Sequence, residues 1–307
     1  MISRRGVLAG LAALGGGAAT RPVRAAGTVS LLDAARRLAA RPYSGTSPPL
    51  PPPFAGLTYD AYRGIRPKAG AAAMLPLAEG WAVDLLPPGL YFPDPVAVDL
   101  PNGDGFSERP FSPGLFDFSP RYFGDVPGQA PGAGFSGLRL RHPLNAADVL
   151  DEVLVVQGAS YFRALGRAAV YGLSSRAVAK GTGGPVAEEF PRFTRLRLHP
   201  PVDGTARLEA LIDSPSLAGH MDMRLEPGEA TRMALTVTLL PRVEIDDIGV
   251  APLTSMFLKG PIRSAVSDDF RPRVHDSDVL LVENGAGEVL WRPISNPATV
   301  QTSVFAD

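Results

Sequence analysis

The chain contains no cysteine among its 307 residues. This absence excludes a disulfide framework, a thiolate metal site and a cysteine nucleophile, so packing alone must stabilise the fold. Histidine is scarce as well, because there are four, and no pair of them has the HExxH spacing of a zinc site. We therefore expect neither a metal nor any other cofactor.

An excess of charge of either sign is also missing. Thirty lysines and arginines face thirty-one aspartates and glutamates, which gives a formal net charge of -1. Such a balance offers no electrostatic reason to bind nucleic acid or an anionic membrane surface. A neutral or weakly charged partner fits better, and the oligomeric state leaves no signal in the sequence.

No apolar run reaches the roughly 20 residues that a membrane-spanning helix needs. The apolar stretch at residues 6–19 follows Arg4 and Arg5 and precedes Val23-Arg24-Ala25, which offers the small residues of a signal peptidase site. This pattern predicts a signal peptide over residues 1–26, of the twin-arginine type, with an ordinary Sec signal as the alternative. Either route predicts a periplasmic protein without stable membrane insertion once the signal is removed.

Residues 27–56 carry a short helix and a linker. Leucine and alanine recur at helical spacing between Ser30 and Ala40, and arginines fill the end that the helix dipole favours for cations. The proline-rich stretch at 47–53 can form neither a helix nor a central strand. It should cross the surface in extended form.

From Leu57 onward the apolar pattern has a period of two. Residues 137–141, 193–198 and 233–239 alternate apolar side chains with arginine or threonine, as half-buried antiparallel strands do. Thirty-three glycines and thirty-two prolines punctuate these runs at the spacing of sandwich hairpins. The sequence predicts an all-β fold, a large antiparallel β-sandwich over residues 57–307, with the aromatic-containing loops of 101–134 packed on it.

The densest group of ionisable residues lies at 268–278, with four carboxylates, two arginines and one histidine in eleven residues. Asp276 and Asp278 share one face if this segment is a strand. A glycosidase needs two carboxylates in different environments, one protonated as the acid and one ionised as the base. The alternative is a solvated loop with local salt bridges.

A second group of candidates combines aromatic with charged side chains at 157–166, 171–176 and 188–191. A sugar-binding groove uses this combination, because an apolar ring face stacks on the sugar while charged groups bind its hydroxyls. The candidate contacts are Tyr161, Arg163, Arg176, Glu188 and Glu189. A structural role, such as closing a turn, is the alternative for each.

Two other site types do not fit. Ser160 and Ser174 lie outside any G-x-S-x-G elbow, which argues against a serine hydrolase. The glycine-rich residues 181–184 lack the following Lys-Ser or Lys-Thr of a phosphate-binding loop.

Several strings, in order, resemble signatures of the periplasmic glucans biosynthesis protein G and D family. They are 57–65 (LTYDAYRGI), 157–166 (QGASYFRALG), 171–174 with Arg176, 188–191 (EEFP), 211–216 (LIDSPS), 249–257 (GVAPLTSMF), 268–278 (DDFRPRVHDSD) and 287–297 (GEVLWRPISNP). The resemblance covers nearly all of the chain after the predicted signal.

This resemblance implies a galactose-mutarotase-like sandwich and a role in making osmoregulated periplasmic glucans with a β-1,2-linked backbone. For some members it implies inverting hydrolysis of that glucan, with an aspartate at the position of Asp276 as general acid. Within the resembling strings, Asp278 and Asp213 are further candidate catalytic carboxylates, and His275 and Trp291 are further candidate glucan contacts. The expected partner is a polymeric glucan.

Three features depart from the family pattern. Gly181 stands where members usually carry aspartate, and Arg273 replaces a glutamate, which places a positive charge near Asp276 and weakens it as an acid. Members also continue beyond the position of Asp307 into the rest of the sandwich and an immunoglobulin-like domain, so we expect an incomplete sheet with an open edge. The alternatives to an enzyme are a non-catalytic carbohydrate-binding protein that retains the groove, or a non-functional gene fragment.

Overall fold

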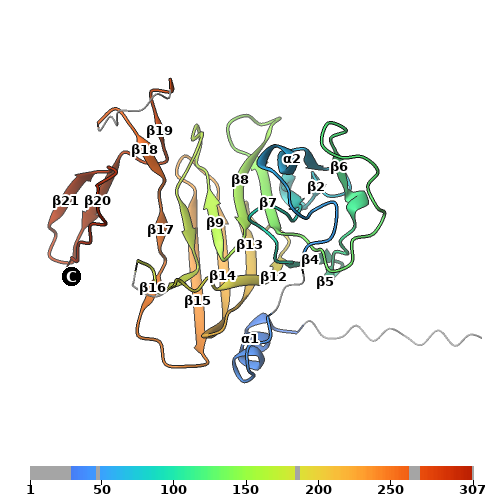
Figure 1. The fold of residues 1–307 in the computed structure, drawn as a ribbon, viewed down its shortest axis with the longest axis horizontal. Coiled ribbons are helices and arrows are strands. Elements are labelled where there is room, and N and C mark those ends of the chain that lie inside the picture. Colours follow the sequence, from blue (N-terminus) through green and yellow to red (C-terminus); the bar gives the residue numbers. More distant parts are fainter. Residues whose placement is uncertain (1–28, 46–48, 184–186, 263–269, 306–307) are drawn as a thin grey trace, which may run out of the picture.

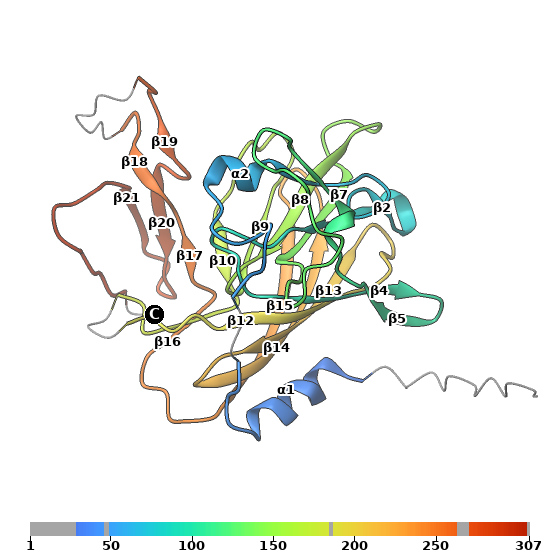
Figure 2. The ribbon, with the colours of Figure 1, turned by 45° about the vertical axis from the view of Figure 1, so that its right-hand side comes forward.

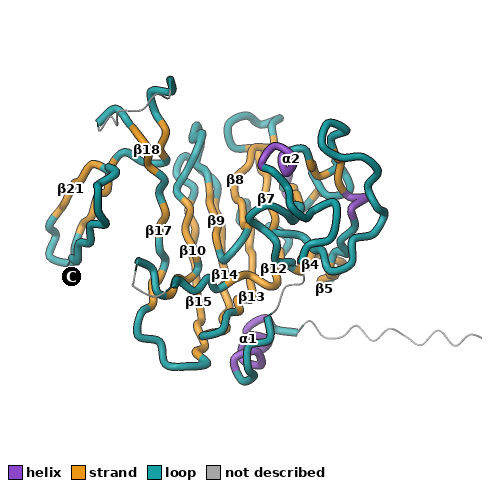
Figure 3. Tube along the Cα trace, in the orientation of Figure 1, coloured by secondary structure: helices purple, strands orange, loops and turns teal. Residues whose placement is uncertain are grey.

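The computed structural model describes residues 29–45, 49–183, 187–262 and 270–305. Strands dominate its regular structure (Figure 3). The helices of these residues are α1 (Leu31–Ala39), α2 (Tyr59–Arg63) and the short 3-10 helices η1 (Ala78–Gly80) and η2 (Pro113–Leu115). None of the described helices has the length and apolar character needed to cross a membrane. The predicted signal peptide lies outside the described residues.

One large sheet has seven strands, each antiparallel to its neighbours. Its strands, in spatial order, are β17 (Leu253–Thr254), β10 (Ser174–Arg176), β9 (Tyr161–Ala164), β8 (Leu150–Gln157), β7 (Gly137–Pro143), β3 (Ala82–Leu86) and β2 (Leu75–Pro76). Residues far apart in sequence therefore meet at one edge, where β17 pairs with β10 (Figure 1).

A second large sheet has six strands and one parallel pairing, between β12 and β4. In spatial order its strands are β15 (Arg232–Pro241), β14 (Leu217–Glu226), β13 (Ala206–Asp213), β12 (Arg192–Leu198), β4 (Ala97–Asn102) and β5 (Gly105–Glu108). The expected alternation at 137–141, 193–198 and 233–239 is confirmed, because these residues form β7, β12 and β15.

The two large sheets share a single hydrophobic core. Leu138 and Leu154 of the seven-stranded sheet and Leu196 and Leu208 of the six-stranded sheet are at most 1 % exposed and belong to the same cluster. Burial of such apolar faces is the main favourable term in folding. The mostly antiparallel β architecture predicted from the sequence is thus confirmed.

Four two-stranded sheets surround this body. They pair β1 (Ile65–Pro67) with β6 (Phe116–Phe118), β11 (Val178–Lys180) with β16 (Ile248–Val250), β18 (Phe257–Lys259) with β19 (Val274–His275), and β20 (Val279–Glu283) with β21 (Val289–Pro293). The last two pairs lie beyond β17, to one side of the large sheets (Figures 1 and 2).

The helix predicted at residues 30–40 is α1, and Ser30 caps it by accepting a hydrogen bond from the backbone N–H of Asp33. It packs on β13, β14 and β15. Two arginines hold its ends: Arg197 Nη1 of β12 donates to Val29 O at 2.9 Å, and Nη2 of Arg242, the residue after β15, donates to Leu38 O at 2.8 Å.

Residues 57–65 depart from the expected strand pattern, because α2 forms there. Thr58 Oγ1 accepts a hydrogen bond from Ala61 N at 3.2 Å, while Asp60 and Arg63 stand at the helix ends that favour their charges. The loops of 101–134 pack on the body as expected, since the Phe111 ring lies 5.2 Å from that of Phe135, and Phe135 is only 1 % exposed.

Candidate functional site

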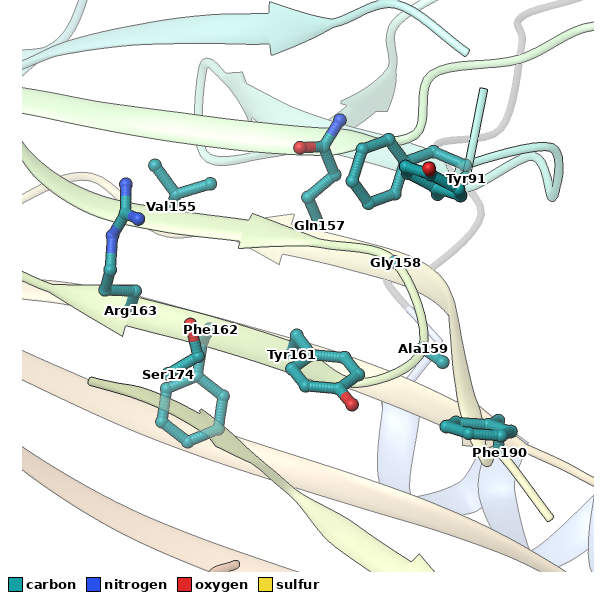
Figure 4. Close-up of a pocket in the computed structure, with 11 residues that line it drawn as sticks. Tyr91, Val155, Gln157, Gly158, Ala159, Tyr161, Phe162, Arg163, Ser174 and Phe190 are labelled. Atoms are coloured by element: carbon teal, nitrogen blue, oxygen red, sulfur yellow. The ribbon is translucent and has the colours of Figure 1, made fainter. Parts of the chain in front are cut away.

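A cavity of about 550 Å³ opens over β8, β9 and β10 (Figure 4). Its walls combine aromatic, polar and arginine side chains, which come from these strands and from three connecting segments. The lining residues are Tyr91, Phe92, Val155, Gln157, Gly158, Ala159, Tyr161, Phe162, Arg163, Ser174 and Phe190. We call this hollow the Tyr161 cavity.

Strand alternation places the charged and aromatic groups on the outer face of the sheet. Phe162 is 4 % exposed and belongs to the core, so Tyr161 and Arg163 on either side of it point to the opposite face. The register then sets Arg176 opposite Tyr161, and Val155 opposite Arg163. Three candidates from two separate sequence segments are thus neighbours.

The turn between β8 and β9 shapes one end of the cavity. Gly158 has φ of +81°, a conformation that favours glycine. A Cβ atom at this position would lie 3.2 Å from Phe92 Cε1, so glycine also leaves room for the Phe92 ring. Tyr91, next to it, is 81 % exposed and offers its ring at the opening.

Arg176, opposite Tyr161, is buried, with 3 % exposure. Its Nη1 forms an ion pair with Glu188, and Thr182 Oγ1 donates a further hydrogen bond to the same carboxylate oxygen at 3.2 Å. The guanidinium carbon lies 5.2 Å from the ring centre of Tyr161 and 5.6 Å from that of Phe190. This cation therefore ties two aromatic side chains of the cavity together.

Arg163 belongs to a row of alternating charges that crosses the sheet. Its Nη2 donates to Glu152 at 2.9 Å, and Arg139 binds the other oxygen of Glu152 at 3.2 Å. Arg139 in turn contacts Asp84, which is fully buried and also binds Arg141 at 2.7 Å. Three arginines thus share two carboxylates, Glu152 and Asp84.

The buried end of this row has a shifted carboxyl group. Burial acts to raise the pKa of Asp84, but a hydrogen bond from Met74 N and the guanidinium groups of Arg141 and Arg139 outweigh it and lower the pKa. Asp84 therefore stays ionised and fixes both arginines in place.

Gln157 connects the cavity to α2. Its Nε2 donates to Tyr62 Oη at 2.9 Å and to Ser136 Oγ at 2.8 Å. Burial raises the pKa of the Tyr62 hydroxyl, and the hydrogen bonds from Gln157 and Ser136 offset part of that rise. The amide of Gln157 is therefore held in one orientation at the wall of the cavity.

Two predicted site residues have structural partners outside the cavity lining. Glu189 accepts hydrogen bonds from the backbone N and the Oγ of Ser216, at 3.0 and 2.7 Å. Burial acts to raise the pKa of Glu189, but hydrogen bonds from Ser214 and Ser216 outweigh it and lower the pKa. Asp213 binds Arg242 at 2.8 Å, next to the end of α1.

The structure brings Asp276, Asp278 and His275 together near β18 and β19, away from the lining of the Tyr161 cavity. Asp276 Oδ2 accepts a hydrogen bond from Met256 N at 3.1 Å, and Asp276 N donates to Met256 O at 2.8 Å. His275 Nε2 lies 3.0 Å from Asp278 Oδ1, while its Nδ1 lies 2.9 Å from Lys259 O.

A short chain path connects Asp276 to the sheet that carries the cavity. Met256 lies two residues after Thr254, and Thr254 is opposite Ser174, which lines the cavity. Thr254 Oγ1 also donates to Ser174 O at 3.2 Å. Asp276 is therefore outside the lining of the Tyr161 cavity and lies beyond the edge strand β17.

The remaining predicted positions are also described. Trp291 lies on β21 with 56 % exposure, opposite Leu281. Gly181 follows β11 with φ of +73°, and Arg273 is exposed before β19. Asp268 and Asp269 lie outside the described residues. Within the described ranges no group of His, Asp and Glu side chains is arranged to hold a metal ion.

The sequence analysis named Tyr161 and Arg163 on the strands of the cavity but missed Tyr91 and Phe92, which lie in the loop before β4. Tyr91 and Phe92 stand alone between prolines and gave no pattern to read, although an exposed aromatic pair in a loop is itself a weak signal for binding. The charge row through Asp84 was missed because its members pair only across strands.

The sequence matches a family profile and several curated relatives. The sequence profile of a family described as periplasmic glucan biosynthesis protein, MdoG, matches residues 28–307. Among curated relatives, glucans biosynthesis protein G of Vibrio cholerae serotype O1 is 42 % identical over 275 residues, which is 89 % of this chain and 50 % of the relative. The protein of the same name from Shewanella frigidimarina is 42 % identical over 283 residues, 91 % of this chain and 50 % of the relative.

A third relative, glucans biosynthesis protein G of Shewanella baltica, is 41 % identical over 285 residues, which cover 91 % of this chain and 51 % of the relative. The chain thus spans about half the length of the curated relatives it matches.

Proposed function

The chain belongs to the periplasmic glucan biosynthesis protein MdoG family and is periplasmic, and from this premise we propose that it binds a polymeric glucan with a β-1,2-linked backbone in the Tyr161 cavity. The observation that carries the proposal is the cavity itself, about 550 Å³ in volume and lined by Tyr91, Phe92, Tyr161 and Phe190. We propose that the protein acts in the biosynthesis of osmoregulated periplasmic glucans.

The aromatic side chains suit a sugar ring. Each face of a glucose unit exposes C–H groups that stack on aromatic rings, while its hydroxyls remain free for hydrogen bonds. Tyr91 and Phe190 are 81 % and 50 % exposed, so both rings are accessible at the rim of the cavity. A chain of several sugar units could therefore be held along it.

The charges of the cavity suit a neutral ligand with many hydroxyl groups. Arg163 and Arg176 are each paired with a carboxylate, Glu152 and Glu188. Arginines held in ion pairs attract an anion less than free arginines do, yet they present strong donors and acceptors in fixed positions. This fits an uncharged glucan backbone better than an anionic substrate.

The finer features of the proposal come from the family resemblance. The two large sheets would correspond to a galactose-mutarotase-like sandwich, and export would follow a twin-arginine signal over residues 1–26. The predicted domain limits, a helix and linker at 27–56 and a glucan-handling domain from 57, belong to the same proposal.

A second candidate function is inverting hydrolysis of the glucan, with Asp276 as general acid. Residues 268–278, which include Asp276, resemble a signature of the family and favour this candidate. The hydrogen bonds between Asp276 and Met256 also hold Asp276 beside the edge strand β17. Inversion needs a second carboxylate that activates water from the opposite face of the sugar. Asp278 and Asp213 stay predictions for that role, and Trp291 and His275 stay predictions for glucan contact.

Incubation of the purified chain with linear β-1,2-glucan tests both candidates. Binding measured by calorimetry, without release of reducing ends, supports a binding protein. Binding together with new reducing ends supports a hydrolase, and absence of binding contradicts both.

A further inference from the structure

A second hollow, of about 740 Å³, lies on the other side of α2 from the Tyr161 cavity. It is bounded by α2, by the β1–β6 pair and by the loop after β6. The linings of the two hollows share no residue. Tyr62 of α2 points to Gln157, whereas Asp60 and Arg63 of the same helix line the second hollow.

Three arginines from three different segments converge on this hollow. Arg63 comes from α2, Arg66 from β1 and Arg121 from the loop after β6, and all three are exposed. Within the described ranges none of their guanidinium groups has a hydrogen bond or an ion pair; Arg63 and Arg121 only contact neighbouring tyrosine rings. Like charges that share one concave site repel each other, and a bound anion relieves that repulsion.

The nearby carboxylates do not cancel this charge. Asp117 lies opposite Arg66 on the paired strand, but its Oδ1 lies 3.8 Å from Lys68 Nζ. Asp60 is the other carboxylate of the lining. Lys68, outside the lining, offsets the charge of Asp117, so the three arginines face Asp60 alone and leave an excess of two positive charges.

We propose that this hollow binds a phosphorylated sugar, with Arg63, Arg66 and Arg121 holding its phosphate group. A phosphate monoester carries between one and two negative charges near neutral pH, which matches the excess, and guanidinium groups bind it through paired N–H donors. The hollow exceeds the size of a single phosphate ion, and Asp60 and Ser119 add acceptors for hydroxyl groups.

The wall of the hollow is also shaped by a close contact. A Cβ atom at Gly64 would lie 2.9 Å from Tyr122 Cδ2 and 3.0 Å from Ala61 O, so only glycine lets the Tyr122 ring pack against the end of α2. Ser119 N donates to Gly64 O at 2.9 Å, which fixes the arginine-bearing loop to the helix. The backbone positions of Arg63 and Arg121 are therefore fixed relative to each other by the fold.

Isothermal titration calorimetry of the purified chain at low ionic strength tests the proposal, with glucose 6-phosphate, glucose and inorganic phosphate as ligands. We expect glucose 6-phosphate to bind, inorganic phosphate to bind more weakly, and glucose not to compete. Arg63→Gln, Arg66→Gln and Arg121→Gln should each weaken binding by at least about fivefold. Added salt should weaken it further, because the arginines are exposed.

Arg232→Gln is the matched control, since Arg232 is an exposed arginine at the start of β15, outside this lining. Thermal unfolding of each variant shows that it is folded. Three results would overturn the proposal: no binding at millimolar glucose 6-phosphate, equal affinity for inorganic phosphate, or equal affinity in the variant lacking all three arginines. Since glucan binding is measured separately, failure here leaves the Tyr161 cavity untouched.

Discussion

Arg176 and Tyr161 stand directly opposite each other on β10 and β9, with the guanidinium carbon 5.2 Å from the ring centre. The arginine is buried, and its partner Glu188 precedes by two residues Phe190, which lines the Tyr161 cavity. The Arg176–Glu188 ion pair therefore supports the Tyr161 ring, which we propose to bind glucan. Folding stability and glucan binding are thus coupled through Arg176.

Replacing Arg176 with glutamine should destabilise the protein by about 3 kcal/mol, because it leaves the carboxylate of Glu188 partly buried without its cation. Arg163→Gln is the matched control. The Arg163 side chain is 22 % exposed against 4 % for Arg176, so this replacement should lower the free energy of unfolding by less. Urea unfolding measures both free energies.

Adding Glu188→Gln to Arg176→Gln should recover part of the lost stability, because the uncompensated charge is then removed. A double variant no more stable than Arg176→Gln would show that the ion pair is not the source of the effect.

Stability should fall with decreasing pH because of Glu209. Hydrogen bonds from His199 and His220, at 2.6 and 2.9 Å, lower the pKa of Glu209 below its ordinary value of 4.5 despite burial. A carboxyl whose folded-state pKa is lowered contributes stability that is present above the unfolded value and lost as pH falls towards the folded one.

We therefore expect the free energy of unfolding to decrease as pH falls below 4.5, the unfolded reference value, and Glu209→Gln to reduce this slope. Glu226→Gln, at the exposed end of β14, serves as the control. Unfolding curves at a series of pH values test this, and an unchanged slope in Glu209→Gln would contradict the assignment.

If the chain cleaves β-1,2-glucan, Asp276→Asn should lower the rate by at least about a hundredfold, as loss of a general acid does. Binding of the glucan should change little, because Asp276 lies outside the Tyr161 cavity lining. Asp213→Asn tests the competing carboxylate, whose partner is Arg242. Reducing-end release measures the rates, and a wild-type rate in Asp276→Asn would exclude it as the acid.

The sequence predicted those parts of the fold and site that depend on local pattern. Period-two alternation identified β7 and β12, and the mixture of aromatic and charged residues named Tyr161 and Arg163 as candidates. The coincidence of Arg176 with Tyr161 needed the register of β9 and β10, which alternation alone does not give.

Local sequence patterns could not predict features that depend on pairing between distant segments. The position of Asp276 is set by the pairing of β17 with β10, about 80 residues apart in sequence, followed by the hydrogen bonds to Met256. The helix α2 was missed because strong local capping by Thr58 overrode the strand pattern around it.

Binding of linear β-1,2-glucan to Tyr161→Ala tests the central claim most directly. Loss of a ring that stacks on sugar should weaken binding roughly tenfold. Tyr59→Ala, which removes a ring that is 62 % exposed on α2 and outside the cavity lining, should bind as the unaltered protein does. Equal affinities in Tyr161→Ala and Tyr59→Ala would contradict glucan binding in the Tyr161 cavity.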